Sequence, residues 1–260
     1  MKTKNLVLLE REEEISLIIL NDQNSFNSLS EGLLKDLFKV LKEADEDSST
    51  KVLVLKGAGR GFSSGHNLKE VTKNQDKSFY RKLMASSKKV MTFLPGLKKP
   101  IIAEVHGVAT AAGCQLVAAC DLAYADTEAK FATPGVNIGL FCHTPLVSVS
   151  RTIAKKHSME MLLLGEMVGA LEAKRFGLIN DVFGPEELHE RVMDIAKIIC
   201  SKSSYILKIG KETFYKQLNM GLEEAYEYAS ERMIKNLGAE DAKEGIDAFL
   251  NKRKPKWKNS

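Results

Sequence analysis

The chain has 260 residues, of which 44% are hydrophobic and 28% charged, enough to bury the core of one large domain, alone or with an appendage. Lys and Arg exceed Asp and Glu by 38 to 34, for a formal net charge of +4, and so small an excess gives no reason to expect nucleic acid as a partner. No apolar run approaches the roughly 20 residues that span a bilayer, so no membrane is expected either.

The cysteines and the N-terminus indicate where the protein works. Cys114, Cys120, Cys142 and Cys200 lie among apolar or small residues and form no C-x-x-C pair. We therefore expect reduced, buried thiols and a reducing compartment. The opening stretch "MKTKNLVLLEREEE" reads neither as a secretory signal nor as an Arg- and Ser-rich transit peptide.

The first predicted elements are a strand and a helix. The apolar run 15–20 predicts a strand, and the polar segment 21–30 predicts a loop. Ser28 and Glu31 form a capping-box pattern, which indicates where the helix begins. Apolar residues then recur at helical spacing over 33–41.

Strands and helices continue to alternate up to about residue 134. Strands are predicted at 51–59, 99–107 and 121–125, with a short fourth at 130–134. A helix is predicted over 78–93, ended by Pro95 and Gly96, and the small apolar segment 108–120 suits a buried helix. This alternation, with glycine turns after two of the strands, favours an α/β architecture.

From His157 onward the pattern is almost entirely helical, with one short strand predicted in 177–183. The segments 221–237 and 239–254 each carry one apolar stripe and one charged face. Such stripes at a chain end pack either on another subunit or on their own domain, and the pattern alone leaves both open.

The stretch "GFSSG" at 61–65 matches the G-x-S-x-G pattern of a serine hydrolase, with Ser63 as the nucleophile. A nucleophile elbow lies directly between a strand and a helix, whereas several residues separate Ser63 from the end of the preceding strand. Asp121 with His143, His157 or His189 could complete a triad, but none lies in a recognisable turn. We expect the match at Ser63 to be incidental.

A second interpretation uses two loops together, "GFSSGHN" and "HGVATAAGC", each of which follows a strand. Their small residues let a ligand approach the main chain, and the second loop opens a helix, whose first N–H groups are free. Two such loops on neighbouring strands can direct two N–H groups at one oxygen, as an oxyanion hole requires. The alternative is that both are glycine turns in a crowded core.

Three stretches carry a family resemblance: "LVLKGAGRGFSSGHNLKE", "KKPIIAEVHGVATAAGCQLVAACDLAYADTEAKFATPGVNIG" and "EDAKEGIDAFLNKRKPKWK". In this order they resemble the enoyl-CoA hydratase/isomerase (crotonase) superfamily over essentially the whole chain. The resemblance implies an α/β fold, with a spiral of ββα repeats over 1–200 and a C-terminal helical trimerisation region over 201–260. It further implies a mitochondrial protein of fatty-acid metabolism, a homotrimer or hexamer, and a coenzyme A thioester as ligand without cofactor or metal.

The resemblance also implies the site. The backbone N–H groups of His66 and Ala112 correspond to the family's oxyanion hole. The expected substrate-binding residues are Ser64, Gly65, Asn67, Gly113, Gln115, Gly135 and Asn137. Hydratases of the family carry glutamates at the positions of Gln115 and Gly135, and basic residues near the positions of Asp22, Gln23 and Asn24. Because glutamine and glycine cannot move a proton, we assign no catalytic residue and expect weak or lost hydratase activity.

Two further functions stay open. The His66 side chain occupies a position that resembles family members which decarboxylate malonyl-type thioesters, so an acyl-CoA decarboxylase or thioester hydrolase is one alternative. His143 is a further polar candidate near the cavity implied by the resemblance. The basic tail "KRKPKWK" makes a non-enzymatic RNA-binding or scaffold protein the other alternative, and RNA binding through it would fall steeply with salt.

Overall fold

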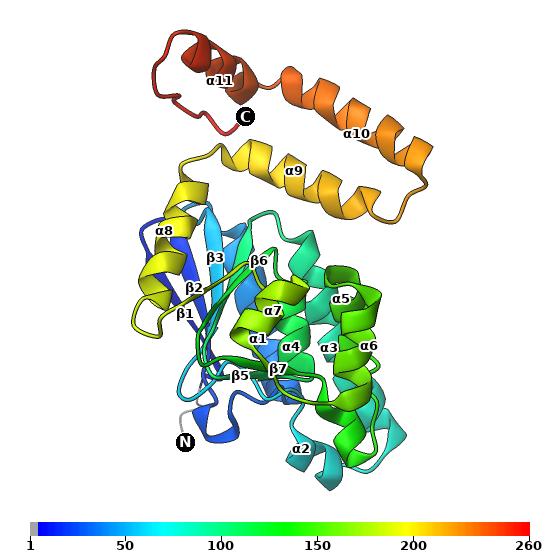
Figure 1. Cartoon of the computed structure of the whole chain (residues 1–260). Helices are drawn as coiled ribbons and strands as arrows, with labels where there is room; N and C mark the ends of the chain where they lie inside the picture. Colours follow the sequence, from blue (N-terminus) through cyan, green and yellow to red (C-terminus); the bar gives the residue numbers. More distant parts are fainter. Residues whose placement is uncertain (1–4) are drawn as a thin grey trace.

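A six-stranded sheet forms the centre of the computed structural model, which describes residues 5–260 (Figure 1). Its strands follow the order β1-β2-β3-β4-β6-β9. Their bounds are β1 Val7–Glu12, β2 Ile15–Leu20, β3 Val52–Gly57, β4 Ile101–Val105, β6 Leu122–Asp126 and β9 Asp181–Phe183. All neighbours pair in parallel except β1, which forms an antiparallel hairpin with β2. Strands alternate with helices along this sheet, which confirms the predicted α/β architecture.

Strand β1 is absent from the elements predicted above. Only Val7 of its six residues is buried, and Glu10, Arg11 and Glu12 are exposed. This edge strand is held instead by its pairing with β2, from Val7 opposite Leu20 to Glu12 opposite Ile15. The predicted strand 15–20, by contrast, matches β2, five of whose six residues are buried.

A second, smaller sheet joins β5 (Val108–Thr110), β7 (Lys130–Ala132) and the two-residue β8 (Val168–Gly169). It corrects the prediction of a helix over 108–120, because the helix α4 begins only at Ala112 and ends at Ala119. Residues 108–110 pair in parallel with 130–132, a contact between distant segments that small residues do not reveal in the sequence. Strand β8 was also not predicted.

Helices cover both faces of the large sheet. α1 (Glu31–Glu46), α3 (Lys77–Gly96) and α4 pack with one face around a core that includes Leu37, Leu55 and Leu116. α8 (Leu188–Cys200) covers the other face through a second apolar cluster that includes Val54 and Val192. The predicted capping box was wrong: Ser30, not Ser28, caps α1, and its side chain accepts from the Leu33 N–H. Pro95 lies within the last turn of α3 rather than beyond the helix.

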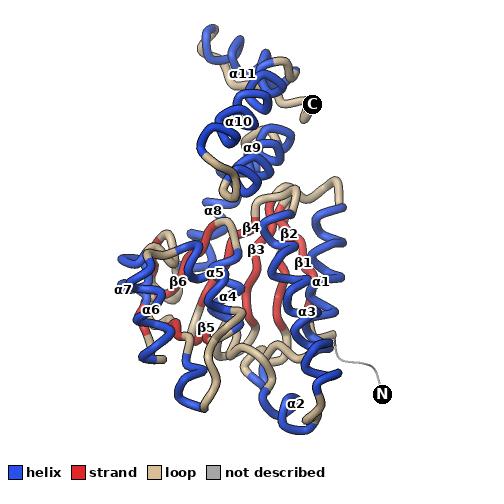
Figure 2. The backbone as a smooth tube through the Cα atoms, turned by 90° about the vertical axis from the view of Figure 1, so that its right-hand side faces the viewer, coloured by secondary structure: helices blue, strands red, loops and turns tan. Residues whose placement is uncertain are grey.

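The shorter elements lie mostly beside the small sheet and at one end of the large one (Figure 2). They are η1 Gln23–Ser25, α2 Leu68–Lys73, η2 Pro134–Ile138, α5 Pro145–Thr152, α6 Lys155–Leu164 and α7 Ala170–Phe176. All four cysteines are buried and free, as predicted. Among residues 5–260, no helix is long and apolar enough to cross a membrane.

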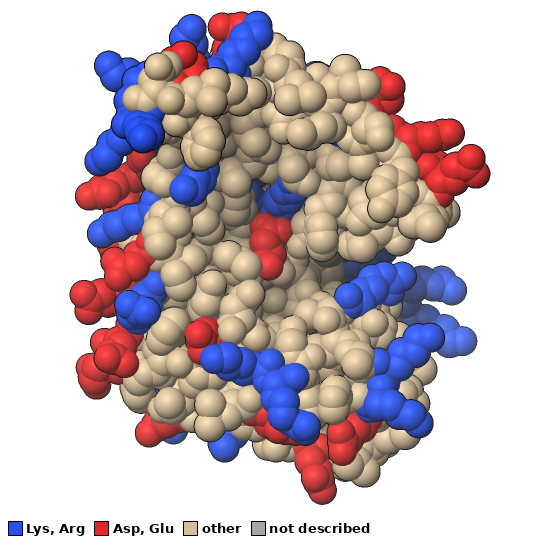
Figure 3. Space-filling model, turned by 45° about the horizontal axis from the view of Figure 1, so that its top comes forward, with Lys and Arg blue, Asp and Glu red and all other residues tan. Residues whose placement is uncertain are grey.

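Three helices, α9 (Ser204–Gln217), α10 (Leu222–Leu237) and α11 (Glu240–Leu250), extend beyond the end of the large sheet (Figures 1 and 2). A polar cluster joins α9 to the core: Asp121 accepts hydrogen bonds from the Lys211 ammonium at 2.6 Å and from the Tyr215 hydroxyl at 2.8 Å. With this end tilted forward, residues other than Lys, Arg, Asp and Glu form a broad surface around a hollow that contains acidic and basic side chains, and most other charged side chains lie towards the edges of the view (Figure 3).

The C-terminal tail folds back onto α9 and α11 around Asp241. This buried carboxylate accepts hydrogen bonds from the backbone N–H groups of Lys258 and Asn259, at 2.6 and 2.9 Å, and from the Ser203 hydroxyl. The Asp241 N–H donates in turn to the carbonyl oxygen of Ser260. The tail therefore has a defined place through its main chain, while the side chains of the lysines at 252, 254, 256 and 258 stay exposed.

Candidate functional site

The two predicted loops lie against each other. The Ser63 N–H donates to the Val108 carbonyl at 3.0 Å, and the Thr110 N–H donates to the Ser63 carbonyl at 2.9 Å. Gly113 makes the approach possible, because a Cβ there would lie 2.2 Å from the Ser63 carbonyl oxygen. The sequence therefore needs glycine at this point of α4, where any side chain would push the loops apart.

The backbone donors come together at this contact. Gly65, with a φ of +86°, is so close to the second loop that a Cβ on it would lie 3.1 Å from the Ala112 nitrogen. Ala111 also has a positive φ of 50°, a strained conformation for a residue with a side chain. Within residues 5–260, neither the His66 N–H nor the Ala112 N–H donates a hydrogen bond. Two free donors thus lie on adjoining segments, and Ala112 opens a helix, whose dipole adds positive potential.

Ser63 has a structural role and is not placed as a nucleophile. It is fully buried, and its hydroxyl donates to the Asn27 carbonyl at 2.9 Å and accepts from the Gly65 N–H. The nominated triad is not assembled either, because Asp121 binds Lys211 and Tyr215. The three nominated histidines lie elsewhere: His143 against Phe141, His157 against Phe176, and His189 beside Glu104.

Three of the predicted substrate-binding side chains are engaged in structural hydrogen bonds. The Ser64 hydroxyl donates to the Ser25 carbonyl at 3.1 Å. Asn67 caps α2 by accepting from the Glu70 N–H, and its amide donates to Ser28. The Asn137 amide donates to the carbonyl of Gly165, at the end of α6. These three side chains therefore contribute to a site by holding the loops in shape.

Gln115 and Gly135 differ in how much room surrounds them. Gln115 is only 4% exposed, and its Oε1 atom has no hydrogen-bond partner in the described structure. At Gly135 a Cβ would lie 3.0 Å from the Leu140 carbonyl oxygen and 3.1 Å from the Cys142 sulfur. The thiol and the loop therefore fill space that a longer side chain at 135 would need.

Burial lowers the pKa of His66 to about 4, because the charged imidazolium would lose its hydration. Its Nε2 atom is buried and has no partner among the described residues. The imidazole is therefore neutral at neutral pH. A neutral ring has no charge with which to attract a substrate carboxylate, so this observation does not support the decarboxylase alternative.

Sequence reasoning missed two features near the loops. Thr133 is fully buried with an unpartnered hydroxyl, and no local pattern marks it. The Arg60 guanidinium lies 4.5 Å above the ring of Phe26, and none of the ion pairs within residues 5–260 involves it. A cation therefore lies close to the loop of Asp22, Gln23 and Asn24, which itself contains no basic residue. Asp22 itself accepts from the Ser25 hydroxyl.

In the described part of the chain, no three His, Cys, Asp or Glu side chains gather closely enough to hold a metal ion. What the arrangement offers chemically is a pair of fixed backbone donors beside buried, uncharged side chains. Such donors stabilise negative charge on a carbonyl oxygen without a metal, since they need no reorganisation when the charge develops.

Known proteins resemble this chain over most of its length. The family model for enoyl-CoA hydratase/isomerase matches residues 10–260. "Enoyl-CoA hydratase domain-containing protein 3, mitochondrial" from Xenopus laevis is 44% identical over 98% of this chain and 87% of that protein. The protein of the same name from Mus musculus is 44% identical over 97% of this chain and 84% of its own length. Both names agree with the mitochondrial location that the resemblance predicted.

Solved structures give the same answer for the fold. An enoyl-CoA hydratase from Mycobacterium smegmatis superposes with a TM-score of 0.95 at 42% identity, over 98% of this chain and 99% of that one. The human enoyl-CoA hydratase domain-containing protein 3 superposes with a TM-score of 0.94 at 42% identity, over 97% of this chain and all of that one.

Proposed function

Because the chain belongs to the enoyl-CoA hydratase/isomerase family, we propose that it binds an acyl-CoA thioester whose carbonyl oxygen accepts hydrogen bonds from the His66 and Ala112 N–H groups. The observation that carries the proposal is the pair of free donors on adjoining segments, held by Gly65 and Gly113. The family and the mitochondrial relatives support a place in fatty-acid metabolism.

Hydratase activity is weak or lost in this proposal. Hydration needs a base to activate water and an acid to protonate carbon, and each contributes about 10²–10⁴-fold. The two positions that carry glutamate in hydratases hold Gln115 and Gly135 here. The oxyanion hole alone would still stabilise an enolate, so a trace rate is expected. Loss of crotonyl-CoA absorbance measures it, and a rate like that of ordinary hydratases would contradict this part of the proposal.

Binding is tested by thermal shift across a panel of acyl-CoAs, because a ligand that binds the native state raises its stability. The Ala112→Pro variant removes one donor at the first position of α4, where proline suits a helix. The control for a proline at the first position of a helix is Lys155→Pro in α6, and circular dichroism of both variants checks that they are folded. We expect the shift to persist in the control and to fall in Ala112→Pro, equivalent to roughly tenfold weaker binding. Equal shifts in both variants would refute the donor role of Ala112.

Arg60 is proposed to supply the positive charge for the phosphates of coenzyme A. Its guanidinium has no carboxylate partner in the described chain, and the ring of Phe26 fixes its plane. An Arg60→Ala variant should bind acetyl-CoA more weakly while binding acetyl-pantetheine, which lacks the nucleotide, as the parent does. An equal loss for both ligands would point to a structural role.

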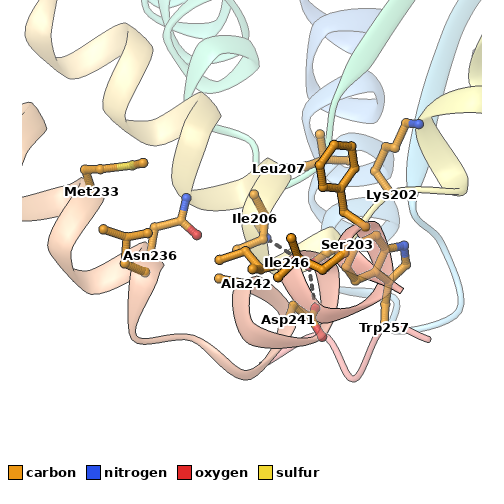
Figure 4. A pocket seen from close by; sticks show the side chains of 14 residues that line it. Lys202, Ser203, Ile206, Leu207, Met233, Asn236, Asp241, Ala242, Ile246 and Trp257 are labelled. Atoms are coloured by element: carbon orange, nitrogen blue, oxygen red, sulfur yellow. Dashed lines mark hydrogen bonds between the residues drawn. The ribbon is translucent and has the colours of Figure 1, made fainter. Parts of the chain in front are cut away.

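The proposal also includes a homotrimer, alone or as a dimer of trimers, with 201–260 as its trimerisation region and the preceding residues as the core. Several apolar side chains of the C-terminal helices are exposed, Leu222 by 78% and Phe249 by 82%. A cavity of about 590 Å³ lies among these helices, with Ile206, Met233 and Ile246 on its walls and Trp257 at one side (Figure 4). Exposed apolar surface of this extent is typical of an interface.

A further inference from the structure

Three side chains around the candidate oxyanion hole carry buried polar atoms without hydrogen-bond partners. They are the Gln115 Oε1, the Thr133 Oγ1 and the His66 Nε2, each shielded from solvent within the described structure. Two neighbouring hydroxyls are paired, in contrast: the Thr110 hydroxyl donates to the Ser64 carbonyl, and the Ser63 hydroxyl donates to the Asn27 carbonyl. Since buried polar groups in native proteins are almost always hydrogen-bonded, three exceptions at one place call for a partner outside the chain.

The three residues belong to segments that meet at Ala111 and Ala112. The Gln115 N–H donates to the Ala111 carbonyl, within the first turn of α4. The Ala111 N–H donates at 2.8 Å to the carbonyl of Ala132, the residue before Thr133. Gly65, the residue before His66, lies directly against the Ala111 side chain and the Ala112 nitrogen. The residues that carry the unpaired atoms therefore surround the place of the proposed thioester carbonyl, where an acyl group would begin.

The charge of this region restricts the ligand. The segments 63–67, 108–116 and 131–143 contain neither Lys nor Arg, and burial keeps His66 neutral at neutral pH. A carboxylate on the acyl group would be buried there without a cation, which is strongly unfavourable. An uncharged oxygen function avoids that cost.

The hydrogen-bonding capacity of the three unpaired atoms restricts the ligand further. The Oε1 atom of Gln115 only accepts, so its partner must donate a proton. A hydroxyl donates one hydrogen bond and accepts two, whereas a ketone only accepts and a plain alkyl chain does neither. A hydroxyl can therefore satisfy Gln115 while accepting from Thr133 or His66.

We propose that Gln115, Thr133 and His66 form a polar acyl subsite that selects acyl-CoA thioesters carrying a hydroxyl group close to the thioester. The inference rests on the proposed function, since it places the thioester carbonyl at His66 and Ala112. It assigns Gln115 a specificity role in a position where it cannot act as an acid or base.

Calorimetric titration with four-carbon thioesters tests the subsite: 2- and 3-hydroxybutyryl-CoA, acetoacetyl-CoA and butyryl-CoA, with malonyl-CoA as the anionic probe. We expect one hydroxybutyryl isomer to bind roughly tenfold tighter than butyryl-CoA and acetoacetyl-CoA, with malonyl-CoA the weakest. Equal affinities for hydroxybutyryl-CoA and butyryl-CoA, or a preference for malonyl-CoA, would overturn the inference while leaving the proposed function standing. If none of the thioesters binds, both fail.

Variants of Gln115 and Thr133 test whether these residues cause the preference for hydroxybutyryl-CoA. Gln115→Met keeps the length of the side chain without its polar atoms, and Thr133→Val replaces a hydroxyl by a methyl group. Each should reduce the ratio of the butyryl-CoA to the hydroxybutyryl-CoA dissociation constant several-fold. Thr133→Ser retains a hydroxyl and should keep most of the preference, which also controls for a packing effect at 133. An unaltered ratio in both Gln115→Met and Thr133→Val would refute the assignment.

Discussion

The helices of the core and the C-terminal helices differ in how much of their surface is buried. Every residue of α4 in the core is buried except Ala118, whereas α10 has no buried residue. Yet both are regular helices, and α10 carries apolar side chains such as Met233 and Leu237 that are more than half exposed. Helices in proteins depend on packing for most of their stability. The difference teaches that the core buries its apolar side chains within one chain, whereas the C-terminal helices leave theirs exposed, as the proposed trimer would require.

The largest effect should come from polar substitutions on that exposed surface. Replacing Leu222 and Phe249 together with Glu removes two side chains whose burial would each contribute about 1.5–3 kcal/mol, and introduces charges into the proposed interface. Light scattering at micromolar concentration should then report a monomer where the parent is a trimer. The control is Lys235→Gln, on an exposed position of α10. A parent that is already monomeric, or a double variant that keeps the parent's mass, would break the comparison.

The same substitution, glycine to alanine, can be made in a helix of each region, and its effects on stability should differ in sign. Gly113→Ala in α4 should lower the free energy of unfolding by about 3 kcal/mol, because the new Cβ overlaps the Ser63 carbonyl oxygen. Gly210→Ala in α9 has nothing within 4 Å of the new Cβ, and should raise it by about 0.5–1 kcal/mol. Urea denaturation measures both. Changes of the same sign would mean that the two helices are not packed as differently as described.

The junction between the two regions is the next target. The Lys211 side chain is only 7% exposed and donates to Asp121 and to the carbonyl oxygens of Leu94 and Lys99. Burial and the nearby carboxylate raise the pKa of the Tyr215 hydroxyl in the same cluster. Lys211→Met should therefore cost about 3 kcal/mol of unfolding free energy, since it leaves Asp121 without its cation. The exposed pair of Lys243 and Glu240 is the control, and Lys243→Met should cost less than about 0.5 kcal/mol. A similar cost for both would show that the junction is not a buried ion pair in solution.

A smaller effect is expected from His66 as the pH falls. Its pKa is about 4 in the folded chain and 6.5 when unperturbed, so the unfolded chain binds more protons between these values. Stability that is complete above pH 6.5 is therefore lost on acidification towards pH 4, by about 2 kcal/mol at pH 5. Urea midpoints of the parent and of His66→Gln at pH 7 and pH 5 isolate this contribution. If the two proteins lose equal stability, His66 is not buried as described.

The sequence predicted the elements whose residues carry their own pattern. The buried strands β2, β3, β4 and β6 are rich in apolar residues, and α1 has helical spacing. The missed strands depend on pairing with distant segments. β1 is a charged edge strand, β5 is built of small residues paired with 130–132, and β8 has two residues. The cap of α1 moved by two residues because both Ser28 and Ser30 fit the local pattern, and only the fold decides between them.

The site divides in the same way. The glycines that bring the loops together stand in recognisable motifs, so the family resemblance could nominate the N–H groups of His66 and Ala112 as the backbone donors. The unpaired hydroxyl of Thr133 could not, because whether a buried group has a partner depends on neighbours from the whole fold. Arg60 was overlooked for a related reason: its contact with Phe26 joins two loops that are 34 residues apart in the sequence (60 minus 26).

The hydrogen bonds around Asp241 affect when the C-terminal helices can reach their final arrangement during synthesis. The groups that satisfy this buried carboxylate include the N–H groups of Lys258 and Asn259, and its own N–H binds Ser260, all of which are synthesised after α11 itself. The core can fold while the chain is still growing, as N-terminal units generally do. Asp241 gains these partners only once residues 258–260 have left the ribosome, so α11 is fastened later than the core folds. In the proposed assembly, a message that stops before codon 258 would therefore yield a folded core whose C-terminal helices lack these bonds.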